Sequence, residues 1–261
     1  MTDSSAGPMA LSRSKPTIVI VMAMEEEAAA VMDVLPFSDP PVLLEDGLPP
    51  LAWTTEVADL NLVLVVNGPD PVFEVASFGT DAATLSTYLS IKHFSPDLVL
   101  SVGVAGGFKS QGAEIGSVYV STDSVRYFDR RVSISVPNYH DYAIGFYPVV
   151  DASNMIRSLG LFSGVVVTGG SFENSATDEE HIRNHGAAVI EMEAAAVAKM
   201  SMLMNTPFLA VKSVVNFEED PAFANQFDTN FSTATRSLAG ALEAIVFYLA
   251  EQGVSFPEHV K

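Results

Sequence analysis

Short apolar runs alternate along the chain with segments whose apolar residues recur at helical spacing. The runs predict strands at residues 17–22, 51–57, 60–66, 97–103, 117–123, 132–136, 161–168, 189–191 and 208–215. Helices are expected at residues 23–35, 73–92, 151–159, 178–185, 194–204 and 232–252, with an irregular aromatic stretch at 137–148. Because strands and helices alternate throughout, the pattern predicts one three-layer α/β domain over residues 16–261.

The net charge and the composition of the chain bear on its binding partners and its location in the cell. Acidic residues outnumber basic ones by 32 to 13, so neither nucleic acid nor an anionic membrane surface is an expected partner. Residues 1–15 are rich in serine and lack the apolar stretch of a signal peptide, which predicts a disordered lead-in. The chain has no cysteine and no apolar run of membrane-spanning length, so we expect a cytoplasmic protein.

The residues that could carry chemistry gather at the predicted ends of strands. The most informative segment is Glu191-Met192-Glu193, which joins a buried apolar run to an alanine-rich helical run. In open α/β proteins small ligands bind at the carboxyl ends of the strands. A carboxylate there can hold two vicinal hydroxyls, and a methionine can lie against a ring. Acidic residues also favour the first turn of a helix because of its dipole, so the triplet alone leaves both interpretations open.

Four further candidates fall at the same predicted edge of the sheet. Glu25-Glu26-Glu27 follows the first strand, and Val104-Ala105-Gly106 lies in a glycine-rich turn that allows close approach of a ligand. Phe172-Glu173 follows a second glycine turn, and Asn216 ends the last strand. Each has a plain structural alternative: a helix start, a change of chain direction, a core aromatic, a turn residue. Their common edge is where a binding pocket is expected.

In order, the motifs AMEEE at 23–27, GVAGGF at 103–108, GGSFENS at 169–175 and VIEMEAAAVA at 189–198 resemble those of the methylthioadenosine/S-adenosylhomocysteine nucleosidases. These enzymes belong to the purine nucleoside phosphorylase superfamily. The segments NGPD at 67–70, SFGT at 77–80 and FDRR at 128–131 are similar to the plant-type branch. The resemblance spans about residues 17–250. It implies a nucleoside phosphorylase-like fold, with a central mixed, twisted sheet flanked by helices, and hydrolysis of the N-glycosidic bond of a purine nucleoside.

The resemblance also implies a role for individual residues. Glu27 matches the general base that activates water, and Glu193 matches the carboxylate that binds the 2′- and 3′-hydroxyls. Met192 matches the methionine lining the sugar, Glu191 the first acid of the motif, and Phe172 the aromatic that stacks on the purine. The residues of the first glycine turn and Glu173 are expected to bind substrate as well.

The stretch from Pro137 to Tyr147 resembles the region that reaches into the pocket of a partner subunit, which implies a homodimer. No cofactor is implied.

The chain departs from the family pattern at four positions. Asn216 stands where the family has an aspartate that protonates the purine at N7, and an amide cannot deliver that proton. Val215, Val104 and Gly170 likewise replace polar residues of the family. Four polar groups missing from one site predict changed chemistry.

Three functions therefore remain. One is a nucleosidase with weakened or altered base specificity, in which Asn216 pairs with a purine of either type. The second is an inactive nucleoside-binding homologue that serves as a sensor or a store. The third, a phosphorylase, ranks last because no arginine lies between Arg13 and Arg126 and Glu27 would repel phosphate.

No metal site is expected. His181 and His185 are spaced one helical turn apart on a polar segment and are interpreted as surface residues. The acidic run Glu218-Glu219-Asp220 lacks regular ligand spacing and is interpreted as a solvated loop.

Overall fold

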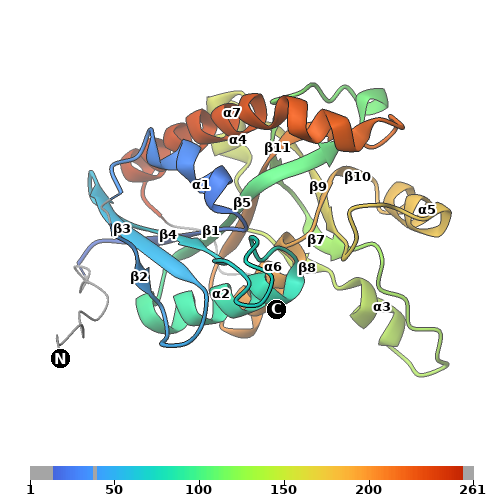
Figure 1. Cartoon of the computed structure of the whole chain (residues 1–261), viewed down its shortest axis with the longest axis horizontal. Helices are drawn as coiled ribbons and strands as arrows, with labels where there is room; N and C mark the ends of the chain where they lie inside the picture. Colours follow the sequence, from blue (N-terminus) through green and yellow to red (C-terminus); the bar gives the residue numbers. More distant parts are fainter. Residues whose placement is uncertain (1–13, 38–39, 255–261) are drawn as a thin grey trace.

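The chain forms a mixed β-sheet with helices on both faces (Figure 1). The computed structural model describes residues 14–37 and 40–254. The strands are β1 (Thr17–Met22), β2 (Val42–Leu43), β3 (Leu51–Val57), β4 (Leu60–Val66), β5 (Leu98–Gly107), β6 (Val118–Ser121), β7 (Ser124–Tyr127), β8 (Tyr147–Pro148), β9 (Phe162–Thr168), β10 (Ala187–Glu191) and β11 (Phe208–Phe217). The helices are α1 (Glu25–Met32), α2 (Thr80–Phe94), α3 (Tyr139–Ile144), α4 (Ser153–Leu159), α5 (Ala176–Asn184), α6 (Ala194–Leu203) and α7 (Phe223–Gln252), with a 3₁₀ turn at Lys109–Gln111.

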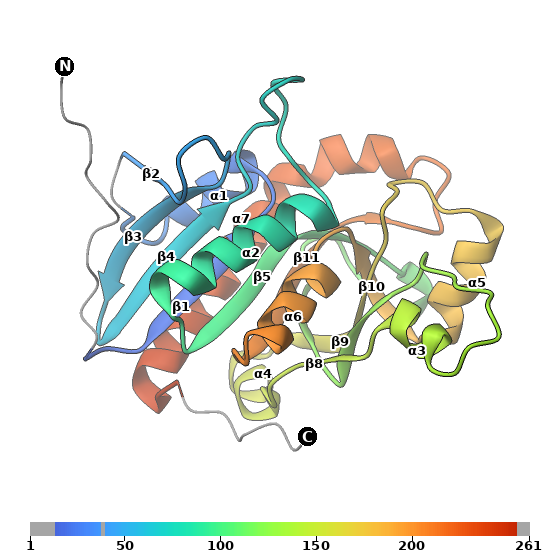
Figure 2. The ribbon, with the colours of Figure 1, turned by 90° about the horizontal axis from the view of Figure 1, so that it is seen from below.

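Side chains that alternate along the strands fill two core layers. In β1, Ile18, Ile20 and Met22 enter a core shared with α1, α4 and α7. Val19 and Val21 enter a second core, shared with α2 and α6. Figure 2 shows α2 and α6 side by side on that face of the sheet. Both faces of β1 are buried, which is why a continuous apolar run marks it in the sequence.

The strand pairings close a ring beside the parallel part of the sheet. β1 runs parallel to β4 and β5, and β5 runs parallel to β11. β6 is antiparallel to β11 and parallel to β9. β10 pairs with both β9 and β5, so β5, β11, β6, β9 and β10 form a closed circuit. As a result Gly106 is paired with Ile190 on one side and with Asn216 on the other.

The predicted fold class is confirmed, whereas one predicted strand is wrong. Residues 132–136 alternate apolar and polar residues but lie mostly exposed and pair with no strand among the described residues. Ser124–Tyr127 (β7) is the strand beside β9 instead. The stretch expected to be irregular contains α3 and β8. Residues 1–13 of the predicted lead-in lie outside the described residues, and Lys15 near its end forms an ion pair with Glu56.

Two helices begin seven or more residues away from their predicted starts. α2 starts at Thr80 rather than residue 73, because Asp70 Oδ1 accepts the backbone N–H groups of Val72 and Phe73 in a turn. α7 starts at Phe223 rather than residue 232, in a segment where Phe223, Phe227 and Phe231 recur at helical spacing among polar residues. Within the described residues, no helix has the length and apolar character needed to cross a membrane.

Candidate functional site

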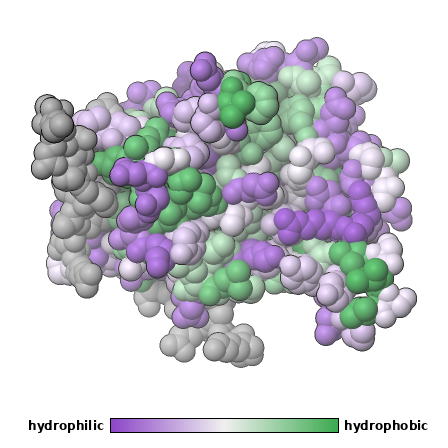
Figure 3. All heavy atoms as spheres, turned by 60° about the horizontal axis from the view of Figure 1, so that its bottom comes forward, coloured by the Kyte–Doolittle hydropathy of each residue, from purple (hydrophilic) through white to green (hydrophobic). Residues whose placement is uncertain are grey.

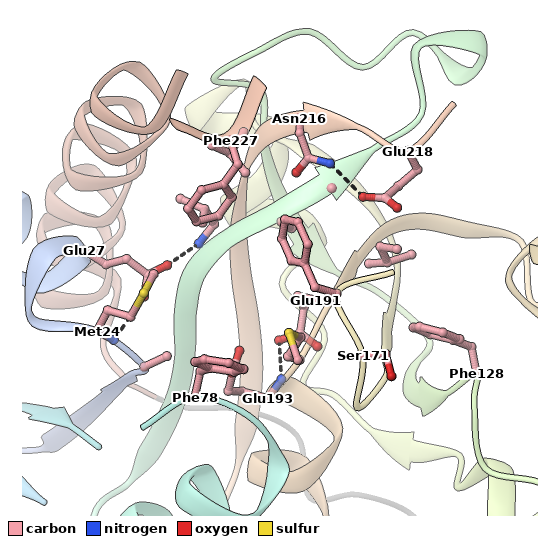
Figure 4. A pocket seen from close by; sticks show the side chains of 18 residues that line it. Met24, Glu27, Phe78, Phe128, Ser171, Glu191, Glu193, Asn216, Glu218 and Phe227 are labelled. Carbon is pink, nitrogen blue, oxygen red and sulfur yellow. Dashed lines mark hydrogen bonds between the residues drawn. The ribbon is translucent and has the colours of Figure 1, made fainter. Parts of the chain in front are cut away.

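A pocket of about 390 Å³ opens where β5, β10 and β11 end (Figure 4). It is lined by Ala23, Met24, Glu27, Phe78, Val104, Ala105, Gly106, Phe128, Ser171, Phe172, Ile190, Glu191, Met192, Glu193, Val215, Asn216, Glu218 and Phe227. The ring of strands therefore brings segments that are more than a hundred residues apart in the sequence to one cavity.

Glu27 lies at one wall of this pocket, in the first turn of α1. Its Oε1 accepts a hydrogen bond from the Val104 N–H at 2.8 Å, and its Oε2 accepts one from Met24 N–H at 3.4 Å. The side chain approaches the backbone of Gly103 closely, since a Cβ there would lie 3.1 Å from Oε1. Burial raises the pKa of Glu27, and the backbone hydrogen bonds and the charge of Lys212 oppose this only in part. A buried carboxyl with a raised pKa is suited to accept a proton.

Lys212 is the buried counter-charge of the site. Its Nζ lies 2.9 Å from Glu191 Oε2 and donates to Ser101 Oγ at 3.1 Å. Burial acts to lower the pKa of Lys212, but the carboxylates of Glu191, Glu193 and Glu27 outweigh it and raise the pKa. Lys212 is therefore held in its charged form. We refer to Glu27, Glu191, Glu193 and Lys212 as the carboxylate cluster.

Glu191 holds the start of α6. Its Oε2 accepts the backbone N–H groups of Glu193 at 3.1 Å and Ala194 at 2.8 Å, and its Oε1 is hydrogen-bonded to Thr168 Oγ1. These hydrogen bonds engage both carboxyl oxygens of Glu191 and fix its side chain at the end of β10. A carboxylate at the start of a helix also interacts favourably with the helix dipole.

Glu193 is the residue of the carboxylate cluster that follows Glu191 on the pocket wall. Its Oε1 accepts a hydrogen bond from Gly79 N–H at 2.7 Å, which ties the loop before α2 to the site. Burial, followed by the charge of Glu191, raises the pKa of Glu193 to about 7. Met192 lines the pocket between the two carboxylates.

A different set of polar groups lies at the end of β11. Asn216 is 2 % exposed, and its Nδ2 donates to Glu218 Oε1 at 2.8 Å. Asn174 Nδ2 donates to the other oxygen, Glu218 Oε2, at 3.0 Å. We refer to these three residues as the amide cluster. Figure 4 shows Asn216 and Glu218 pointing toward each other, on the opposite side of the pocket from Glu27. Burial raises the pKa of Glu218, against the two amide hydrogen bonds.

Aromatic rings also line the pocket. Phe172 is 45 % exposed and lies against Phe223 and Phe227 of α7, with ring centroids 5.4 and 5.8 Å apart. Phe78 reaches the pocket from the loop before α2. Rings that are partly open to a cavity can stack on a planar ligand.

Nine of the ten site residues expected from the sequence line this one pocket: Glu27, Val104, Ala105, Gly106, Phe172, Glu191, Met192, Glu193 and Asn216. Glu173 does not; its side chain is exposed outside the lining. Glu218 corrects the interpretation of its segment as a solvated loop, because it is half-buried and lines the pocket. Sequence reasoning missed Lys212 as well, although a lone charge within the apolar run 208–215 was a usable signal.

Among the described residues, no group of three or more His, Asp or Glu side chains is arranged to hold a metal ion.

The chain matches known proteins over nearly its whole length. The profile described as the phosphorylase superfamily matches residues 17–246. A 5′-methylthioadenosine nucleosidase of Arabidopsis thaliana is 32 % identical, over 92 % of this chain and 89 % of that protein. A 5′-methylthioadenosine/S-adenosylhomocysteine nucleosidase of the same plant is 33 % identical, over 92 % and 94 %. The apo structure of an Arabidopsis thaliana 5′-methylthioadenosine nucleosidase superposes with a TM-score of 0.87 at 30 % identity, covering 92 % of this chain and 98 % of that one.

Proposed function

The chain belongs to the phosphorylase superfamily, within its methylthioadenosine/S-adenosylhomocysteine nucleosidases, and on this premise we propose that it hydrolyses the N-glycosidic bond of a purine nucleoside. We expect its substrates to carry a 5′-thio substituent, because the plant relatives are named for methylthioadenosine and S-adenosylhomocysteine. The products are the free purine and the sugar.

The observation that carries this proposal is the place of Glu27. Its carboxyl is buried and faces the pocket in which Glu193 offers a second carboxyl. In the proposed reaction Glu193 accepts hydrogen bonds from the 2′- and 3′-hydroxyls, and Glu27 takes a proton from the attacking water. The transition state of glycosidic cleavage is oxocarbenium-like, so carboxylates around the sugar also stabilise the developing positive charge.

The same geometry favours water over phosphate as the nucleophile. A phosphate would need free backbone N–H groups or arginine at the glycine-rich turn. Val104 N–H already donates to Glu27 Oε1, and the Glu27 carboxyl faces the position that an anion would occupy. Hydrolysis is thus the better fit to these contacts.

The opposite end of the pocket supports altered handling of the base. Asn216 has no acidic proton to give, and loss of general acid catalysis costs about 10²–10⁴-fold in rate. The second candidate function, a nucleoside-binding homologue without turnover, rests on this residue alone.

The assay that separates the two functions is base release from methylthioadenosine, S-adenosylhomocysteine, adenosine and inosine, followed by chromatography. Calorimetric binding of the same compounds runs beside it. We expect base release from at least one adenine nucleoside, and a Glu27→Gln variant that still binds but turns over about 10²–10⁴-fold more slowly. Binding without release by the unmodified chain would establish the second function instead.

We also propose that the protein is a homodimer. Val72, Phe73 and Phe78 before α2, and Tyr142 and Phe146 in and after α3, are large apolar residues more than half exposed. Figure 3 shows hydrophobic groups among hydrophilic ones on the side of the molecule that it views. Contact with a second copy would bury such residues.

Light scattering tests this state. We expect a dimer mass for the unmodified chain and a monomer mass for Tyr142→Glu. Phe247→Glu, at an exposed position on α7, is the control and should stay dimeric.

A further inference from the structure

We propose that Glu218 is the proton donor to the leaving purine, in place of the acid that Asn216 cannot supply. This rests on the proposed function, since a proton donor is needed only if the N-glycosidic bond is broken. Glu218 thereby has a catalytic task, although it belongs to the acidic run 218–220.

The position of Glu218 is the first argument. It lines the pocket together with Asn216, which donates to its Oε1, and Gly106. A Cβ at residue 106 would overlap with Glu218 Oε1, so the carboxyl occupies space that the absence of a side chain at Gly106 leaves open. The carboxyl is thus seated against the glycine-rich turn rather than in solvent. It lies across the pocket from Glu27, as a general acid should lie across the substrate from the general base (Figure 4).

The surroundings of Glu218 allow it to carry a proton. Its hydrogen-bond partners, Asn174 and Asn216, are both neutral amides, and each carboxyl oxygen accepts one bond and keeps a second lone pair free. No hydrogen bond or ion pair from a cation to Glu218 is recorded in the described residues.

The charged groups nearest to Glu218 are engaged elsewhere. Glu219, the next residue, is hydrogen-bonded to Ser110. Lys109 Nζ lies 5.8 Å from the ring centroid of Phe217. Glu179 and Arg183 of α5 line a second, larger cavity that Glu218 also lines, and they pair with each other at 3.7 Å. Burial without a cationic partner favours the protonated carboxyl, which agrees with the raised pKa of Glu218.

The proposed step balances without any co-reactant. Water forms a bond to C1′ and loses a proton to Glu27. The bond from C1′ to the purine nitrogen breaks, and its electron pair goes to the purine. Glu218 gives its proton to a purine ring nitrogen, so the base leaves neutral. Glu27 then releases its proton to solvent and Glu218 takes one up. The net reaction converts the nucleoside and water into the free purine and the sugar.

The test compares two leaving groups in Glu218→Gln. Methylthioadenosine needs a proton on its base, whereas p-nitrophenyl riboside releases a phenolate that leaves unprotonated. We expect kcat for methylthioadenosine to fall by about 100-fold or more, while turnover of the activated riboside changes by less than about threefold. Retained turnover of the activated riboside also shows that the variant is folded. The matched control is Glu219→Gln, in which both rates should stay unchanged.

Other outcomes of this comparison overturn the inference. An equal fall for both substrates would mean that Glu218 acts on the sugar or on folding. A raised KM with an unchanged kcat would mean that it only positions Asn216. If the unmodified chain hydrolyses methylthioadenosine and Glu218→Gln does so equally well, the inference fails alone. If the unmodified chain hydrolyses neither substrate, the proposed function fails.

The pH dependence of the unmodified chain is a second test, which needs no variant. A general acid works in its protonated form, so kcat/KM for methylthioadenosine should fall as the pH rises past the pKa of Glu218. The activated riboside should lack this alkaline fall, and both substrates should share the acid limb of Glu27. Alkaline limbs that coincide for the two substrates would contradict the proposal.

Discussion

The carboxylate cluster and the amide cluster occupy opposite ends of one pocket, and they are held in different ways. In the carboxylate cluster, an ion pair joins Lys212 to Glu191. Glu191 in turn accepts hydrogen bonds from the backbone N–H groups at the start of α6. In the amide cluster, the neutral amides of Asn174 and Asn216 hold a single carboxyl, and within the described residues Glu218 forms no ion pair. The carboxylate cluster is therefore tied to the backbone of α6, whereas the amide cluster is held by hydrogen bonds between side chains.

This difference shows which end can change without loss of the fold. Replacing Lys212 or Glu191 leaves the buried charge of the other uncompensated, which costs several kcal/mol. Replacing a member of the amide cluster removes hydrogen bonds worth about 1 kcal/mol each. Of the departures from the family pattern that the sequence predicts, Val215 and Asn216 lie at the second end of the pocket, whereas Val104 contacts Glu27 at the first. Variants at each end can test the contrast.

The largest effect is expected from Lys212→Met. The variant keeps most of the side-chain volume but leaves Glu191 buried without its counter-charge, which should lower the free energy of unfolding by about 3–5 kcal/mol. Denaturant unfolding measures it. Lys92→Met, at an exposed position in α2, is the control and should change stability by less than about 0.5 kcal/mol. A loss below about 1 kcal/mol for Lys212→Met would contradict the structural role of the pair.

Glu193→Gln should weaken nucleoside binding about 100-fold, because charged hydrogen bonds to two hydroxyls are lost. It should also stabilise the fold at pH 8 but not at pH 4.5. The pKa of Glu193 is raised from its ordinary 4.5 to about 7 in the folded chain, so its contribution to stability is present below pH 4.5 and lost as the pH rises through 7. Calorimetry and melting curves at the two pH values measure both effects. Equal shifts in Tm at both would contradict the raised pKa.

Phe172→Ala tests the aromatic wall beside the amide cluster. Stacking of a base on an aromatic side chain is worth about 1–3 kcal/mol, so nucleoside affinity should fall roughly 10- to 100-fold. The unfolding free energy should change little, because the ring is 45 % exposed. Calorimetric titration measures the affinity, with Phe247→Ala as the control. An unchanged affinity would place the base elsewhere.

The smallest effect is expected from Asn216→Asp. The new carboxyl would lie beside Glu218, and like charges at that distance favour a shared proton. If Glu218 already donates the proton, adenine release should rise by less than about tenfold, and its alkaline limit should move to higher pH. A pH profile of base release measures both. A rise above about 100-fold would mean that the unmodified chain lacks a proton donor.

Much of the fold could be predicted because strands that are buried on both faces appear in the sequence as continuous apolar runs. The strands β1, β3 and β4 have the predicted bounds, 17–22, 51–57 and 60–66. Residues 132–136 show the limit of that signal, because an alternating pattern does not say whether a partner strand is available. Most candidate site residues could be placed at one edge because strand ends in such a sheet converge.

The amide cluster could not be predicted in the same way. Glu218 is seated by Asn174, by Asn216 and by the absence of a Cβ at Gly106, three positions from separate segments. Nothing within the acidic run itself distinguishes Glu218 from the exposed Glu219. Burial of a single charged residue is decided by tertiary contacts, which local composition does not record.

The order of the strands also determines what the molecule offers to its neighbours. The two ends of the strand order are β2 and β8, each only two residues long, and β8 ends in Pro148, which has no N–H to donate. Long unpaired edges are templates on which strands of other molecules add and fibrils grow. In the described part of the chain, the long apolar strands β1, β4, β5 and β11 have partner strands on both sides, so they are shielded from edge-to-edge addition.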